Sequence, residues 1–283
     1  SMALPDSLPA PHLTARRFGA RRLLLLTDEA LFECAGVRIA FTGREGGKSS
    51  GPYSSLNLGS HVDDDPAAVE ANRAILLDAL GAGDTRLIVP NQVHGDTIVR
   101  IDDTASAALD AACRRAADGA DAVAVAVEGV AALLCFADCV PVIVVSPSGR
   151  FAVVHAGWRG AVENIAGKTV RLLVEADRSD GAYGDAGAFN VYVGPHIHAE
   201  CFETGADVRA RFAARFGTSC ICDESHVDLL EALRVGLVEA GAARDRIVDA
   251  GACTKCAPDR YFSYRASGGT CGRHGAIAFR KTR

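Results

Sequence analysis

Three short segments carry side chains that could hold a metal ion. Residues 91–95 read NQVHG, residues 137–141 read ADCVP, and residues 154–160 read VHAGWRG. Each places a histidine or cysteine beside glycine or proline at an expected strand end, and these residues are His94, Cys139 and His155. Two imidazoles and one thiolate would form an open zinc site, because three protein ligands leave the fourth tetrahedral position for water or substrate. The long intervals between the segments are not a local finger pattern, so a buried thiol and two hydrogen-bonded histidines are the alternative.

Two charged residues adjoin these candidate ligands. Asp138 directly precedes Cys139, where it could orient a ligand histidine or accept a proton. The alternative role is that of an ordinary turn aspartate. Arg159 follows Trp158, the only tryptophan of the chain, and could bind phosphate or cap the helix expected next. We therefore take Asp138 as a catalytic candidate and Arg159 as a substrate-binding candidate.

The elements that must position these residues are mostly short strands. Apolar runs rich in valine and isoleucine have strand lengths at 86–90, 97–101, 121–127, 130–136, 141–145, 151–155 and 190–194. Residues 37–42 alternate like a half-buried strand, and two more strands are expected at 261–265 and 275–280. Amphipathic helices are expected at 66–81, 159–176, 204–216 and 226–241. The strands come in groups rather than in strict alternation with helices, which favours an α+β sandwich over a doubly wound parallel sheet.

The N-terminal residues 1–20 differ in composition from the rest. They contain Pro5, Pro9 and Pro11 in a mixture of small and polar residues, which predicts a flexible arm. Beyond residue 20 there is no convincing linker or repeat. We therefore expect one catalytic domain over residues 21–283.

Composition and charge exclude several classes of function. The 30 basic and 35 acidic residues give a formal net charge of −5, whereas nucleic acid and anionic lipid both require a basic face. No stretch reaches about 18 uninterrupted apolar residues, so a membrane span is not expected. Ten cysteines in 283 residues are too few for a disulfide scaffold. We expect a cytoplasmic protein whose cysteines are thiols, metal ligands or nucleophiles.

Several motifs together resemble the YfiH family, also called laccase-domain or polyphenol oxidase proteins, purine nucleoside phosphorylases and peptidoglycan editing factors. The matching segments are NQVHGD, ADCVP, HAGWRG, VGPHIHAECFETG and CTKCAPDRYFSYR, which follow one another in this order. The likeness runs from about residue 38 to the C-terminus. It implies a four-layer α/β/β/α sandwich with mixed sheets, and zinc bound by His94, Cys139 and His155.

The resemblance also implies an activity. It points to phosphorolysis of adenosine, inosine and methylthioadenosine, with purine nucleoside and phosphate as substrates, and to deamination of adenosine. The family has an early Thr-x-Arg-x-Gly-Gly segment, which here begins at Thr42 and contains Arg44. Arg44 could hold an anionic oxygen by a bidentate contact, whereas the alternative is a solvated arginine in a turn.

Three other functions compete with this one. A metal-free cysteine hydrolase could use Cys139 as nucleophile with His94 or His155 as base. A related alternative is an amidase acting on peptidoglycan precursors, with either Cys139 or zinc-bound water as nucleophile. A copper oxidase needs several coppers, for which the eight histidines are too few. A non-enzymatic nucleotide-binding module is the third alternative.

A second metal-like pattern lies near the C-terminus. Cys253 and Cys256 form one pair and Cys271 and His274 another, with 14 residues between them, a spacing similar to that of a zinc ribbon. The resemblance gives the second pair no ligand role. The tripeptide His196-x-His198 also resembles a metal motif, and we expect it to line a cleft or lie at the surface.

Overall fold

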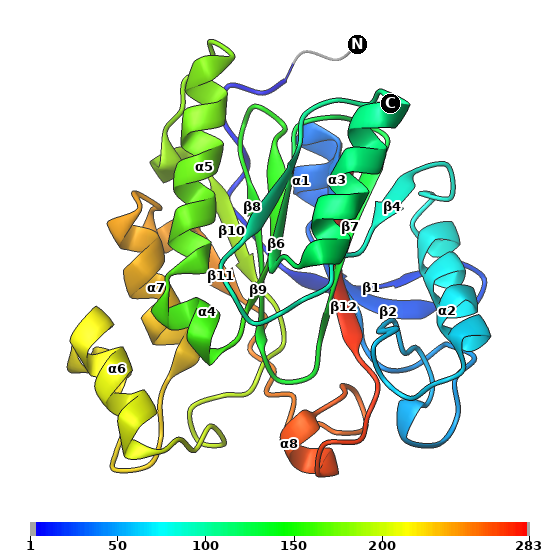
Figure 1. Cartoon of the computed structure of the whole chain (residues 1–283). Coiled ribbons are helices and arrows are strands. Elements are labelled where there is room, and N and C mark those ends of the chain that lie inside the picture. The colour runs from blue at the N-terminus through cyan, green and yellow to red at the C-terminus, as the bar shows by residue number, and fades with distance from the viewer. Residues whose placement is uncertain (1–3, 282–283) are drawn as a thin grey trace.

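The computed structural model describes residues 4–281, and its strands form two six-stranded sheets (Figure 1). In order across the first sheet, the strands are β1 (Thr14–Phe18), β2 (Leu23–Thr27), β3 (Val37–Phe41), β12 (His274–Arg280), β7 (Val130–Phe136) and β4 (Arg86–Ile88). In the second sheet they are β11 (Ile247–Asp249), β10 (Asn190–Val193), β8 (Val140–Val145), β9 (Phe151–Ala156), β6 (Ala122–Val125) and β5 (Ile98–Ile101). The pairs β4–β7, β5–β6 and β10–β11 are parallel and the others antiparallel, so both sheets are mixed.

The helices cover the outer faces of the two sheets. One side carries α4 (Trp158–Val162), α5 (Ile165–Ser179), α6 (Ala206–Phe216) and α7 (Leu229–Glu239), which pack on the second sheet. The other side carries α2 (Pro66–Ala79), which packs on the first sheet (Figure 1). Three more helices are α1 (Glu29–Ala35), α3 (Ser106–Asp118) and α8 (Tyr264–Ser267), of which α1 and α3 join the core between the sheets. The four-layer α+β sandwich is therefore confirmed. None of the described helices is both long and apolar enough to cross a membrane.

The alternation of side chains along each strand builds three cores at once. On β8, Val142 and Val144 face the helices, while Ile143 and Val145 face the first sheet. Both faces are buried, so the strand is apolar throughout and rich in β-branched residues. On β9 the same alternation directs His155 to the side of Val153, toward the space between the sheets. The candidate ligand is therefore placed by strand register.

The predicted helix at 159–176 is divided at Asn164, whose φ of 55° interrupts the helical backbone. The side-chain oxygen of Asn164 accepts a hydrogen bond from the Gly167 N–H, and its side-chain NH₂ group donates to the Gly236 carbonyl of α7. Asn164 therefore caps α5 and fixes it to α7 at the same time. As a result, α4 is a short separate helix that carries Trp158 and Arg159 beside the end of β9.

Much of the N-terminal segment that was predicted to be a flexible arm packs on the domain. Thr14–Phe18 is an edge strand paired antiparallel with β2, and Leu8 is buried. The His12 N–H donates to Asp28, and the Pro9 carbonyl accepts from Asn190. The prolines prevent a helix here, but an extended chain can still follow the surface and bind polar groups of the domain. Residues 1–3 lie outside the described residues.

The predicted strand at 261–265 is wrong. This segment is a loop that leads into α8, and the Arg265 N–H at its end donates to the Asp138 carboxylate. The apolar pattern of this segment suggested a strand, but its backbone is held by a tertiary contact with Asp138 rather than by a neighbouring strand.

Candidate functional site

The structure brings His94, Cys139 and His155 together at one end of the central strands β8 and β9 of the second sheet. His155 is the penultimate residue of β9, and Cys139 directly precedes β8, whose first residue pairs with Ala156. His94 lies in the loop between β4 and β5. One donor atom from each residue lies within 4.8 Å of the others. His155 is buried, Cys139 is half-buried and His94 is exposed, so the three donor atoms meet at the boundary between the core and solvent.

Asp121, which the sequence did not single out, organises this cluster. Its carboxylate lies 2.7 Å from Nδ1 of His155 and accepts the N–H groups of Val93, His94 and Gly95 at 3.0–3.1 Å. Asp121 immediately precedes β6, the neighbour of β9, so strand pairing delivers it to the histidine. One fully buried carboxylate thus shapes the His94 loop and orients His155, leaving Nε2 for the cluster. Its only sequence signal is an acidic residue at the start of an apolar strand.

Gln92 fixes the same loop to the first sheet. Its side-chain amide donates to the Cys135 carbonyl and its side-chain oxygen accepts the Cys135 N–H, both at 2.8 Å. Cys135 belongs to β7. Gln92 therefore holds the loop to the first sheet, and Asp121 holds it to the second. Together these contacts keep His94 in a left-handed backbone conformation with φ of 60°.

Cys139 and His155 of the donor set shift each other's pKa. Burial raises the pKa of the Cys139 thiol, but the charge and hydrogen bonds of His155 and His94 outweigh burial and lower it to about 6. Burial lowers the pKa of His155, and the Cys139 thiolate and Asp121 outweigh this effect and raise it to about 9. The pair therefore favours thiolate and imidazolium near neutral pH. A thiolate is the form in which cysteine binds metal or attacks an electrophile.

The space around the three donor atoms fits a metal ion of the size and ligand preference of zinc. Tetrahedral zinc with bonds of about 2.0–2.3 Å holds its ligand atoms roughly 3.3–3.8 Å apart, and the donor atoms here all lie within 4.8 Å of one another. A Cβ atom at Gly157 would lie 3.0 Å from the His94 ring and 3.3 Å from the Cys139 sulfur. Glycine therefore keeps open the space that a fourth ligand would need.

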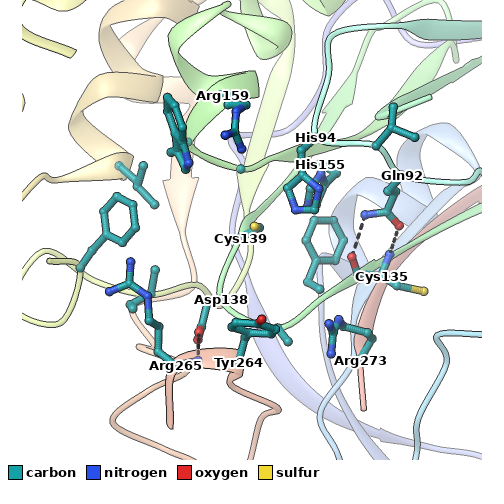
Figure 2. A pocket seen from close by; sticks show the side chains of 18 of the residues that line it. Gln92, His94, Cys135, Asp138, Cys139, His155, Arg159, Tyr264, Arg265 and Arg273 are labelled. Atoms are coloured by element: carbon teal, nitrogen blue, oxygen red, sulfur yellow. Dashed lines mark hydrogen bonds between the residues drawn. The ribbon is translucent and has the colours of Figure 1, made fainter. Parts of the chain in front are cut away.

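A cavity of about 640 Å³ opens beside the cluster (Figure 2). Arg159, Arg265 and Arg273 line it, and their guanidinium groups lie over the rings of Trp158, Phe202 and Tyr264 at 4.4, 5.2 and 5.9 Å. Figure 2 shows Arg265, Tyr264 and Arg273 across the cavity from His94 and His155. The other lining residues are His61, Gln92, Val93, Cys135, Phe136, Ala137, Asp138, Gly157, Ile197 and Leu229. Among these described lining residues Asp138 is the only acidic one, so the cavity suits an anion.

The Asp138 carboxylate is committed to another task. It accepts hydrogen bonds from the hydroxyls of Thr254 and Ser263, both at 2.7 Å, and from the Arg265 N–H at 2.8 Å. No hydrogen bond between Asp138 and the ligand histidines is found in the described chain, in contrast to the sequence prediction. The backbone of Asp138, with φ of 109°, turns the carboxylate away from the cluster and toward the C-terminal loop. Asp138 therefore anchors a cavity wall. The role of orienting a histidine, which the sequence suggested for Asp138, belongs to Asp121.

Arg44, which the sequence suggested as a substrate-binding candidate, is not among the residues that line this cavity. Its guanidinium donates to the carbonyls of Ser54 and Pro258 at 2.8 and 2.7 Å and lies over the Phe262 ring. These contacts join two loops. The structure instead brings Arg265 and Arg273 to the cavity, and neither was singled out from the sequence. Arg159 lines the cavity.

The two C-terminal pairs do not come together. Cys271 packs against Ala137 and Phe262, and Nδ1 of His274 accepts the Phe262 N–H at 3.1 Å. Cys253 and Cys256 lie elsewhere, beside Cys201 and Glu200. His196 is buried rather than cleft-lining, and it clusters with His198 and Asp249.

The chain is similar in sequence to a family model and to curated proteins. A family model described as multi-copper polyphenol oxidoreductase laccase matches residues 38–281. The chain is 35% identical to a purine nucleoside phosphorylase of Pseudomonas aeruginosa, over 87% of this chain and 94% of that one. It is 34% identical to adenosine deaminase RL5 of an unknown prokaryotic organism, over 87% and 95% of the two chains.

Solved structures agree with these relatives. The crystal structure of YlmD from Geobacillus stearothermophilus matches with a TM-score of 0.77 and 31% identity, over 94% of this chain and all of that one. The hypothetical protein YfiH of Bacillus licheniformis matches with a TM-score of 0.78 and 28% identity, over 92% and 96% of the two chains. The chain therefore belongs to the laccase-like YfiH family, whose model is described as multi-copper polyphenol oxidoreductase laccase.

Proposed function

We propose that this chain is a purine nucleoside phosphorylase that also deaminates adenosine, with zinc held by His94, Cys139 and His155. The relatives named above support both reactions. The observation that carries the proposal is one cavity that has a His–Cys–His donor set on one side and arginines with aromatic rings on the other. We further propose one catalytic domain over residues 21–283, to whose first sheet β1 of the N-terminal segment adds an edge strand. We also propose a cytoplasmic location, which the free thiols of the described residues support.

Different residues of the cavity wall would bind phosphate and the purine. The guanidinium groups of Arg265 and Arg273 would hold phosphate by charge-assisted hydrogen bonds. The apolar surface of Trp158 and Phe202 would accept the purine, in a cavity whose 640 Å³ is typical of small-molecule sites.

Phosphorolysis needs phosphate at C1′ as the purine departs. A phosphate oxygen forms a bond to C1′, the bond from C1′ to the purine nitrogen breaks, and its electron pair leaves with the base. Arginine side chains that fix phosphate in line with that bond would lower the barrier through positioning. When bound at the donor set, zinc would polarise a substrate oxygen or lower the pKa of a water molecule toward about 7, which deamination requires. The role of the chain is to keep Cys139 as thiolate and His155 oriented through Asp121.

Zinc is proposed over copper because of the ligands. Two imidazoles, one thiolate and an open position match catalytic zinc, whereas a multi-copper oxidase needs further histidine sets. Metal analysis of the purified protein decides between them.

The test is chromatographic analysis of products from adenosine with phosphate. Adenine with ribose 1-phosphate is expected from phosphorolysis, and inosine from deamination. Cys139→Ala should abolish both reactions together with the zinc bound at the His94–Cys139–His155 donor set, whereas Cys222→Ser, at an exposed thiol outside the cavity, should change neither. Adenosine left intact by zinc-loaded protein would overturn the proposal.

One observation favours a second candidate, a metal-free cysteine amidase. Cys139, His155 and Asp121 form a chain of nucleophile, base and orienting carboxylate, and the Cys139 pKa of about 6 is that of an activated thiol. A peptidoglycan precursor would be its substrate. Such an enzyme would survive chelation and lose activity on alkylation with iodoacetamide, whereas the zinc enzyme would lose activity on chelation.

A further inference from the structure

A second group of sulfur atoms lies outside the cavity. One ligand atom each from Cys201, Cys253, Cys256 and Glu200 falls within 4.8 Å of the others. The Sγ atoms of Cys201 and Cys256 are 3.4 Å apart. This exceeds the bond length of a disulfide, about 2.05 Å, and approaches the separation of about 3.8 Å between two thiolates on one tetrahedral zinc.

Chain topology explains why these residues meet. Strands β10 and β11 are parallel neighbours, and Val193 pairs with Asp249 at their shared end. The loops that follow both strands therefore leave the same edge of the sheet. The first loop supplies Cys201, and the second supplies Cys253 and Cys256 with the two-residue spacing common in structural zinc sites.

The Cys253 sulfur accepts a backbone hydrogen bond of the kind that metal-bound thiolates accept. The His198 N–H donates to its sulfur at 3.4 Å, and Cys253 itself is buried. Hydrogen bonds from backbone amides to ligand sulfurs orient the ligand and offset its negative charge. Cys256 and Glu200 are exposed, so an ion can enter from solvent.

We propose that Cys201, Cys253 and Cys256 bind a structural zinc ion, with Glu200 or water as the fourth ligand. Three thiolates with one oxygen ligand suit zinc better than magnesium or calcium, which prefer oxygen throughout. The proposal does not depend on the nucleoside reaction.

The zinc ion would brace the wall of the neighbouring cavity. Phe202 follows Cys201 and lines the cavity, and Thr254 follows Cys253 and donates its hydroxyl to Asp138 at 2.7 Å. Linking the two loops would fix both contacts. The metal would thus support substrate binding without touching substrate.

The test uses the full chain in a Cys139→Ala background, which removes the other proposed site. After saturation with zinc under reducing conditions and removal of excess metal, about one zinc ion per chain should remain. Adding Cys256→Ser should remove it, whereas adding Cys222→Ser, at an exposed thiol elsewhere, should not. Cys256 is exposed, so its replacement leaves the core intact.

Cobalt substitution gives a second measurement that does not need activity. Cobalt in the Cys139→Ala protein should show a near-ultraviolet thiolate charge-transfer band, which Cys256→Ser abolishes. Binding at His196, His198 and Asp249 would produce no such band, because that cluster has no sulfur. Failure of Cys139→Ala to retain zinc, or a spectrum without the band, would overturn the proposal. So would a disulfide, revealed if the denatured, unreduced wild-type protein alkylates at two fewer sites than its ten cysteines.

Discussion

Replacing Asp121 by asparagine should weaken metal binding while leaving the size of the side chain unchanged. One carboxylate oxygen accepts the N–H groups of Val93 and Gly95, and the other contacts the His94 N–H and Nδ1 of His155. If the amide oxygen keeps the first two partners, its NH₂ group must face the other two. It then donates to Nδ1, which forces the His155 proton onto Nε2, the atom needed for metal.

The expected magnitudes follow from these contacts. Loss of an orienting carboxylate typically lowers metal affinity by about 10–100-fold, or roughly 1.4–2.8 kcal/mol. The His94 N–H would also lose a charged acceptor, which should lower the free energy of unfolding of the metal-free protein by about 1.5–3 kcal/mol. Deamination and phosphorolysis should fall together, because both depend on the same site.

The assay is competition for zinc between the protein and a coloured chelator, with urea unfolding of the metal-free protein in parallel. Asp177→Asn is the matched control, since Asp177 is equally buried but binds Ser146 and Arg150 away from the cavity. That variant should lose stability and keep its zinc affinity. If Asp121→Asn binds zinc within about twofold of the wild type, the orienting role assigned to Asp121 is refuted.

Four further predictions test other charged groups of the chain. Arg273→Ala should raise the KM for phosphate at least about tenfold in phosphorolysis assays, because it removes a cavity guanidinium, and an unchanged KM would contradict the anion site. Arg44→Ala should leave that KM unchanged but destabilise the protein to urea by about 1–3 kcal/mol, through loss of two hydrogen bonds to carbonyls. In metal-free protein, alkylation of Cys139 should accelerate as pH rises through about 6, whereas Cys222, whose pKa burial raises above 9, should react only at higher pH; equal profiles in peptide mass spectra would refute the His155–thiolate pair. The hydrogen bond from Arg38 outweighs burial and, with Arg16, lowers the Glu29 pKa from 4.5 to about 2, so ionised Glu29 stabilises the fold above pH 4.5 and this contribution disappears as pH falls toward 2. Glu29→Gln should therefore be less stable than the wild type at about pH 6 and equally stable near pH 2 by urea unfolding, and a difference that persists near pH 2 would contradict this assignment.

The sequence by itself indicated the candidate metal ligands and the fold class for local reasons. Alternating valine and isoleucine runs report strands directly, because each strand face is buried against a different layer. His94, Cys139 and His155 stood out because each ends or precedes a strand beside glycine or proline. Their residue types limit the chemistry to metal binding or nucleophilic attack. These features depend on neighbours within a few residues.

The roles of the charged residues were decided only by tertiary structure. Asp121 reaches His155 through pairing of β6 with β9, and Asp138 turns away from the cluster because its left-handed backbone directs it to Thr254 and Ser263. Arg44 is bound to loop carbonyls, while Arg265 and Arg273 reach the cavity from the C-terminal segment. A carboxylate or guanidinium acts on whichever partner lies within about 3 Å, and that distance depends on sheet register and loop packing rather than on adjacent sequence.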